Sequence, residues 1–211
     1  MTTMNAEDDD LAAGDDLGDP NERRSQWQDV LTAFRAPTIP IVEPWSISIA
    51  TLIGSAYKVP SIASKALAQL DRVGALRLTS EAITFDTDDV EWNKLSTVRC
   101  RPAGEVLADS AVRREIDSVR KVLPPIPGRK WVVNRLADGV SQVATIALER
   151  VGGLNSRRAI ATELEYRGGL GRRRSTESGV VVSALLAVVP DLNDVVLRMA
   201  QQHGARIEGY S

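Results

Sequence analysis

The stretch GALRLTSEAITFDTDDVEWNKLSTVRCR, residues 74–101, has the most regular pattern in the chain and decides the expected fold class. Apolar residues alternate with polar ones in two short segments and recur in a third: Leu76 and Leu78, Ile83 and Phe85, then Val90, Trp92, Leu95 and Val98. Such alternation is typical of β-strands with one buried face, and Pro102 ends the pattern. We therefore predict an antiparallel meander over residues 75–101, with one apolar and one polar face.

Three aspartates lie in the turn of this stretch, at Asp86, Asp88 and Asp89. Carboxylates at such short spacing suggest a calcium site, but the segment lacks the glycine and the later bidentate glutamate of an EF-hand loop. An ordinary solvated turn is the preferred interpretation.

The same residues carry a resemblance to a known family. GALRLTSEAITFDTDDVEWNKLSTVR resembles the strand, turn and W-x-x-L/I-x-x-V rhythm of bacterial pleckstrin-homology-like and GRAM-type domains, in which a glycine-led L-x-L-T strand precedes an apolar strand and a tryptophan strand. The resemblance implies a sheet that acts as a platform for lipid headgroups or peptides. The helical pattern after Pro102 is longer than that of such domains. The whole chain also resembles a type of actinobacterial protein, a likeness that adds no chemistry.

The composition predicts a folded protein. With 211 residues, 43% of them hydrophobic and 26% charged, the chain can bury one sizeable core. A single cysteine excludes an internal disulfide framework, and the start of the chain has no signal-peptide pattern. The longest apolar run, residues 179–190, is too short for a membrane-spanning helix. We expect a cytoplasmic location, with the inner face of the plasma membrane as the alternative place of action.

The net charge of −2 divides unevenly along the chain. Residues 1–20 carry seven acidic side chains and no lysine or arginine, so this tail has a charge of −7 and the remainder +5. A segment with so few large apolar residues cannot offset the entropy of ordering, and we predict a disordered acidic tail. The tail either solubilises the protein or acts as a mobile polyanion that shields the basic body.

Residues 21–45 are predicted to form an amphipathic helix followed by a proline-rich connector. Trp27, Val30, Leu31 and Phe34 recur at helical spacing, with Asn21 or Ser25 as the expected N-cap. This aromatic stripe either covers the core or contacts a protein partner, and the core interpretation is preferred. Pro37, Pro40 and Pro44 then keep the chain extended.

Residues 46–211 are predicted to form a single α+β domain. Residues 46–58 fit either a helix or a strand, and residues 60–74 fit a helix. Two amphipathic helices at about 107–123 and 129–152, joined by PPIPG, are expected as a helical hairpin inserted into the β domain at about 107–152. Residues 179–189 favour a helix over a buried strand. A C-terminal helix after Pro190 and a final edge strand complete the expected α+β fold.

Cationic residues gather in two places within this domain. Strands on either side of GGLG, residues 168–171, predict a hairpin surrounded by six arginines: Arg157, Arg158, Arg167, Arg172, Arg173 and Arg174. Glycines beside arginines suit oxyanions, but no nucleotide-binding glycine motif is present. A second group, Arg129, Lys130 and Trp131, has the mixture found at membrane interfaces. For each group taken alone the simpler interpretation is preferred: the hairpin is solvated, and Trp131 packs into the core while Arg129 and Lys130 face water.

The sequence lacks the constellations that catalysis needs. Cys100 lies between Arg99 and Arg101, which would favour a thiolate, but a thiolate nucleophile also needs a base and His203 is the sole ordinary candidate. Cys100 is instead expected to pack beside Val98 on the inner face of its strand. His203 is the only histidine and is expected in the last turn of a helix, which leaves no set of zinc ligands. We therefore predict a protein without catalytic residues, metal or cofactor.

The leading hypothesis is a non-enzymatic binding or adaptor protein, peripheral to the membrane, that contacts anions through the two cationic groups. The second hypothesis is a protein-interaction module that uses the N-terminal helix or a sheet edge. Nucleic-acid binding ranks lower because no aromatic residues interleave with the arginines. The sequence does not predict an oligomeric state.

Overall fold

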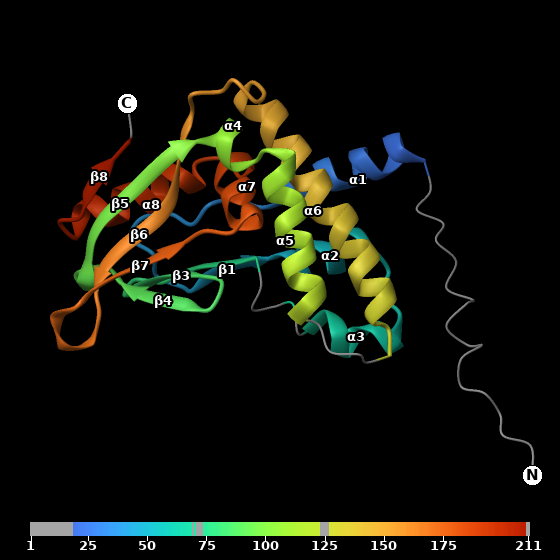
Figure 1. The fold of residues 1–211 in the computed structure, drawn as a ribbon, viewed down its shortest axis with the longest axis horizontal. Helices are drawn as coiled ribbons and strands as arrows, with labels where there is room; N and C mark the ends of the chain where they lie inside the picture. Colours follow the sequence, from blue (N-terminus) through green and yellow to red (C-terminus); the bar gives the residue numbers. More distant parts are fainter. Residues whose placement is uncertain (1–18, 69, 71–73, 123–126, 210–211) are drawn as a thin grey trace, which may run out of the picture.

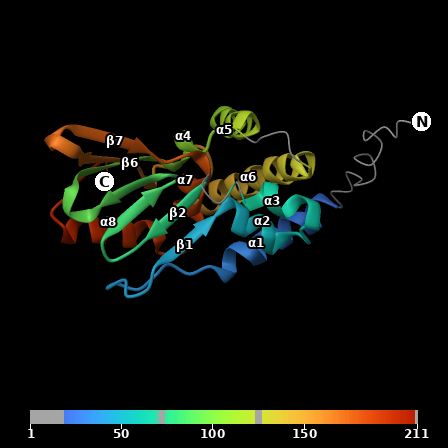
Figure 2. The same ribbon diagram turned by 90° about the horizontal axis from the view of Figure 1, so that it is seen from below.

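The computed structural model describes residues 19–68, 70, 74–122 and 127–209, and these residues form an α+β fold (Figure 1). The predicted acidic tail lies outside the described residues except for Asp19 and Pro20. The described residues form two four-stranded sheets, with helices between and beside them (Figure 2). The α+β prediction is therefore confirmed.

The first sheet is a meander of four short antiparallel strands in the order β1-β2-β3-β4. Its strands are β1 (Trp45–Ser48), β2 (Ala75–Leu78), β3 (Ala82–Phe85) and β4 (Asp88–Glu91). Leu76, Leu78, Ile83 and Phe85 are buried, as their alternation predicts, and Arg77 and Thr84 lie on the opposite face. The amphipathic meander is confirmed for these strands.

The predicted third segment of the meander is divided between the two sheets, so a single meander over 75–101 was wrong. A 3₁₀ turn at Trp92–Lys94 ends β4, and β5 (Leu95–Pro102) then joins the second sheet. Trp92 and Leu95 are three positions apart, which in a continuous strand would place them on opposite faces. Both are buried because the chain turns between them.

The second sheet has the order β7-β6-β5-β8. Strands β6 (Ala159–Arg167) and β7 (Arg173–Glu177) form the predicted hairpin, and β6 pairs antiparallel with β5. The final strand β8 (Arg206–Glu208) lies at the edge and pairs parallel with β5, in agreement with the predicted edge strand.

A wholly buried helix lies at the centre of the molecule. All nine residues of α7 (Val180–Val188) are buried, and the helix contacts α6 (Arg129–Val151), β6 and β2 (Figure 1). This burial explains why the segment is apolar all round, and it confirms the favoured helix. Helix α8 (Leu192–Gln202) follows, and the short helix α4 (Ala103–Val106) lies between β5 and α5 (Asp109–Val122). Helices α5 and α6 form the predicted helical hairpin.

The ambiguous segment 46–58 contains both a strand and a helix. Strand β1 ends at Ser48, whose hydroxyl accepts a hydrogen bond from the Thr51 backbone N–H at 3.1 Å and so caps α2 (Ile49–Ala56). The next helix, α3 (Ser61–Ala68), buries Ala63 and Ala66.

The N-terminal helix α1 (Pro20–Ala33) packs against α2 and α6. Its N-cap is Asp19, whose carboxylate accepts a hydrogen bond from the Asn21 N–H at 2.7 Å, so the predicted caps Asn21 and Ser25 were wrong. Pro20 occupies the first helical position, where its missing N–H costs nothing. Trp27 and Leu31 are fully buried and belong to the core that α7 shares.

Among the described residues, no single helix is long and apolar enough to cross a membrane. Helices α7 and α8 reach the required length and hydropathy only as a pair, and they are bent by 100° relative to each other.

Candidate functional site

The structure separates the predicted cationic contacts into three groups. Arg157 and Arg158 precede β6, whereas Arg167 ends it and faces the arginines of β7. A strand of nine residues at about 3.3 Å each puts Arg158 and Arg167 roughly 30 Å apart. Arg129 begins the 23-residue helix α6, and Arg157 follows the other end of that helix, which is about 34 Å long. The cations therefore do not share one site.

The tip of the β6–β7 hairpin, residues 167–174, holds four exposed arginines: Arg167, Arg172, Arg173 and Arg174. Among the described residues, none of these four side chains forms an ion pair. Arg167 lies directly opposite Arg173 in the antiparallel register, a like-charged pair that opposes hairpin formation. The hairpin tip is the densest cationic feature of the described chain, and it projects at one end of the molecule (Figure 1).

Glycines shape the turn of this hairpin. Gly171 has φ of 69°, in the left-handed region that favours glycine, and the Gly168 N–H donates to the Arg172 carbonyl at 2.8 Å. A Cβ on Gly168 would lie 2.8 Å from Cδ of Arg174, so the arginine side chain lies across the bare glycine backbone. The turn thus holds the Arg174 stem close to the strand.

The middle of the same sheet has the opposite arrangement. Arg99 on β5 forms ion pairs with Glu163 at 3.1 Å, Glu165 at 2.6 Å and Glu208 at 3.3 Å. Hydrogen bonding to Glu163 is the main cause that raises the pKa of Arg99, although the group is exposed. The cation in the middle of the sheet is thus compensated by three carboxylates, whereas those at the hairpin tip are not.

The second predicted group lies at the start of α6. Arg129 is half-buried, Lys130 is exposed and Trp131 is half-buried. The Arg135 guanidinium lies 5.9 Å from the Trp131 ring and 4.6 Å from the Tyr57 ring. The Trp131 indole thus contacts its own chain, so less of its surface is available to a membrane interface.

The predicted partner-contact residues of α1 face the body of the protein. Trp27 and Leu31 are buried, and Val30 and Phe34 are half-buried against the core. A polar cluster fixes the helix in place. Tyr57 donates to Asp138, the Trp27 indole N–H donates to the Tyr57 hydroxyl at 3.2 Å, and Arg23 pairs with Asp138 at 3.3 Å. Within this structure the aromatic stripe is used inside the chain, in agreement with the preferred core interpretation.

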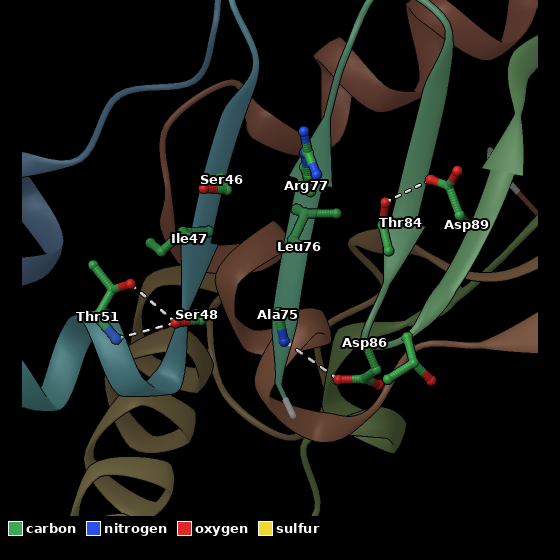
Figure 3. Close-up of a pocket in the computed structure, with 11 residues that line it drawn as sticks. Ser46, Ile47, Ser48, Thr51, Ala75, Leu76, Arg77, Thr84, Asp86 and Asp89 are labelled. Atoms are coloured by element: carbon green, nitrogen blue, oxygen red, sulfur yellow. Dashed lines mark hydrogen bonds between the residues drawn. The ribbon is translucent and has the colours of Figure 1, made fainter. Parts of the chain in front are cut away.

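A pocket of about 680 Å³ lies on the polar face of the first sheet (Figure 3). One transverse row of side chains crosses its four strands in register: Ser46, Arg77, Thr84 and Asp89. The Thr84 hydroxyl donates to Oδ1 of Asp89 at 2.8 Å. Arg77 forms no ion pair within the described chain, although it and Asp89 stand only two strands apart.

One end of the pocket is closed by α2 and by the β3–β4 turn. Thr51 of α2 lines one side, and Asp86 lines the other (Figure 3). The Asp86 carboxylate accepts hydrogen bonds from the N–H groups of Gly74 at 2.5 Å and Ala75 at 3.3 Å. Burial raises the pKa of Asp86, against the effect of these two hydrogen bonds. The prediction of an ordinary solvated turn was therefore wrong for this residue, whose carboxylate ties the turn to β2.

A second partly buried carboxylate joins α5 to α7. Glu115 accepts hydrogen bonds from the backbone N–H groups of Val180 at 2.5 Å and Val181 at 3.2 Å, which are the first two residues of α7. It therefore satisfies two N–H groups that have no partner within the helix and meets the positive end of the helix dipole. Burial raises the pKa of Glu115, and the charge of Asp86 raises it further.

The two residues considered for catalysis do not form a catalytic pair. Cys100 is buried, as predicted, and burial raises the pKa of its thiol to about 11. His203 caps α8, its Nδ1 lies 2.9 Å from the Met199 carbonyl oxygen, and its ring stacks on Trp92 at 6.0 Å. The described residues contain no group of three or more potential metal ligands.

Most residues of the pocket were not predicted from the sequence. Alternation placed Arg77 on the polar face, but nothing local indicated that Ser46, 31 residues away, would stand beside it. Each strand carries a polar residue on its outer face, and this is the only local sign of the pocket. These residues can be recognised as neighbours in one row only when the strand register is known.

Comparisons with family models, with curated proteins and with solved structures found no match to this chain.

Proposed function

We propose that the chain is a non-enzymatic binding protein that attaches to an anionic membrane surface through the tip of its β6–β7 hairpin. The observation that carries the proposal is the register of this hairpin, which sets Arg167 directly opposite Arg173 without a compensating carboxylate among the described residues. Such a pair weakens the isolated hairpin, and an anion between the two strands would reverse that effect.

A lipid surface suits this arrangement better than a small phosphate does. The four arginines are all exposed, and they belong to a hairpin that projects at one end of the molecule (Figure 1). A basic segment near an anionic leaflet gains about 1 kcal/mol per arginine, so four arginines give weak and reversible attachment. The protein would thus act at the inner face of the plasma membrane while also existing free in the cytoplasm.

The test is flotation of the purified chain with vesicles of neutral lipid or with 30% anionic phosphatidylglycerol. The double variant Arg167→Gln/Arg173→Gln removes two charges from the tip, and Arg157→Gln/Arg158→Gln removes two charges from the far end of β6. Attachment to anionic vesicles should weaken about 30-fold in the first variant and little in the second.

Two results would contradict the proposal. Equal weakening in both variants would show that net charge, and not the hairpin, drives attachment. Binding of a single-stranded oligonucleotide without any binding to vesicles would favour the nucleic-acid alternative. Circular dichroism of each variant should confirm that it remains folded.

A further inference from the structure

The pocket on the polar face of the first sheet is independent of the hairpin tip and has its own chemistry. It is formed by β1, β2, β3, the β3–β4 region and the start of α2, none of which belongs to the second sheet. Its volume of about 680 Å³ lies within the range of about 300–1,000 Å³ that small-molecule sites occupy. The pocket thus has the size of a ligand site.

The cation in this pocket has no partner within the described chain. Arg77 is exposed on β2, and its neighbours in the row are the hydroxyl residues Ser46 and Thr84. Figure 3 shows the Arg77 side chain standing between β1 and β3, away from the Thr84–Asp89 hydrogen bond. A guanidinium flanked by a hydroxyl is suited to a carboxylate or phosphate, which accepts from both.

Two carboxylates line this pocket, and one of them, Asp89, is held in place but is only partly satisfied. Thr84 donates to Oδ1 of Asp89, and the structure gives Oδ2 of Asp89 no partner among the described residues. The backbones of Arg77 and Asp89 are separated by two strand spacings, about 10 Å, so that Thr84 stands between them. A ligand in the row therefore meets a donor at one end and an acceptor at the other.

We infer that this pocket binds a small polar molecule that carries both an anionic group and a hydrogen-bond donor. The carboxylate or phosphate lies on Arg77 and the Ser46 hydroxyl, and an ammonium or hydroxyl group lies on Asp89. The Thr84 hydroxyl fixes the Asp89 carboxylate, and the hydrogen bonds of Asp86 hold the turn that closes the pocket. Binding is non-covalent and involves no reaction.

The test is a titration of the ¹⁵N-labelled chain, observed by amide chemical shifts. The probes are serine and O-phosphoethanolamine, which carry both groups, and acetate, inorganic phosphate and methylammonium, which carry one each. Serine or O-phosphoethanolamine should shift the amides of the row and bind more tightly than any probe with a single group. The preferred member of the pair identifies the anionic group as carboxylate or phosphate.

Two variants assign the two ends of the pocket. Arg77→Gln should weaken the binding of the two-group probe at least about tenfold, and Arg206→Gln, an exposed strand arginine of the second sheet, should leave it unchanged. Asp89→Asn should weaken the two-group probe while leaving acetate and inorganic phosphate unaffected.

The inference would be overturned by any of three results. These are no shift in the row with any probe, equal binding to the Arg77→Gln and wild-type chains, and tightest binding by methylammonium. None of them bears on vesicle attachment, so this inference and the proposed function can fail separately.

Discussion

Replacement of Trp27 by alanine tests whether α1 is part of the core or a free docking helix. The side chain is fully buried, its indole lies edge-on to the Tyr57 ring at 6.0 Å, and its outer edge approaches Gly139 of α6. A buried aromatic side chain removes about 150–250 Å² from water, worth roughly 4–6 kcal/mol at about 25 cal/mol per Å². Truncations of this kind cost about 3–5 kcal/mol in measured cores.

The lost hydrogen bond adds little to this cost, because the Tyr57 hydroxyl still donates to Asp138. We therefore expect Trp27→Ala to lower the free energy of unfolding by about 4 kcal/mol. With a urea m-value of about 2–3 kcal/mol per M, the midpoint of urea unfolding should fall by about 1.3–2 M. Circular dichroism during a urea titration measures this shift.

The matched control is Trp131→Ala, because Trp131 is half-buried and should cost about half as much or less. A shift for Trp27→Ala no larger than that of the control would refute the reasoning. The aromatic face of α1 would then be only loosely attached, and it would again be a candidate contact for a protein partner.

Three further predictions concern the core and its ionisable groups. Gly139→Ala would place a Cβ 2.9 Å from Cη2 of Trp27, so overpacking of about 1–3 kcal/mol should exceed the helix-propensity gain of about 1 kcal/mol and lower the urea midpoint. Burial raises the pKa of Glu115 from its ordinary 4.5, so the folded chain binds this proton more tightly than the unfolded chain. The protonated Glu115 therefore stabilises the wild-type fold fully below the ordinary pKa of 4.5, and this stabilisation is lost as the pH rises through the raised pKa of the folded chain. Glutamine at this position does not titrate, so Glu115→Gln should gain stability relative to wild type between pH 5 and pH 7.5. An unchanged difference between the two chains would contradict this assignment. Cys100, with its pKa raised to about 11 by burial, should react with a thiol reagent at pH 8 far more slowly in the native chain than in urea, and equal rates would contradict its burial.

The sequence predicted the elements of this fold better than their assembly. Period-two alternation identified β2 and β3 because each strand has one buried face, and period-3.6 stripes identified α1 and α5 because each helix has one. The break at Trp92–Lys94 was visible as a three-residue spacing, but only the structure shows that β5 enters a second sheet.

The parts that escaped prediction depend on contacts between distant residues. Glu115 caps α7 across 65 positions, and Asp88 of β4 accepts a hydrogen bond from Thr176 of β7 across 88 positions at 2.6 Å. A local pattern carries no information on such pairs, because the same polar residue satisfies a solvated turn equally well. For the same reason, the sequence left open whether the arginines share one face. They are neighbours along the chain, but the structure places them at opposite ends of β6.

Screening decides how far these separated charges can act together. At physiological ionic strength the screening length is about 8 Å, whereas Arg158 and Arg167 lie roughly 30 Å apart along β6. Arg99, between them, is compensated by three glutamates. Under the proposed function, attraction to a membrane depends on the four arginines within one tip, and neither the net charge of −2 nor the +5 of residues 21–211 measures it. The salt dependence of vesicle binding should accordingly be the same for wild type and Arg157→Gln/Arg158→Gln. It should be about half as steep for Arg167→Gln/Arg173→Gln, which keeps two of the four arginines of the tip. A slope that falls equally in both variants would show that the whole surface acts as one charge.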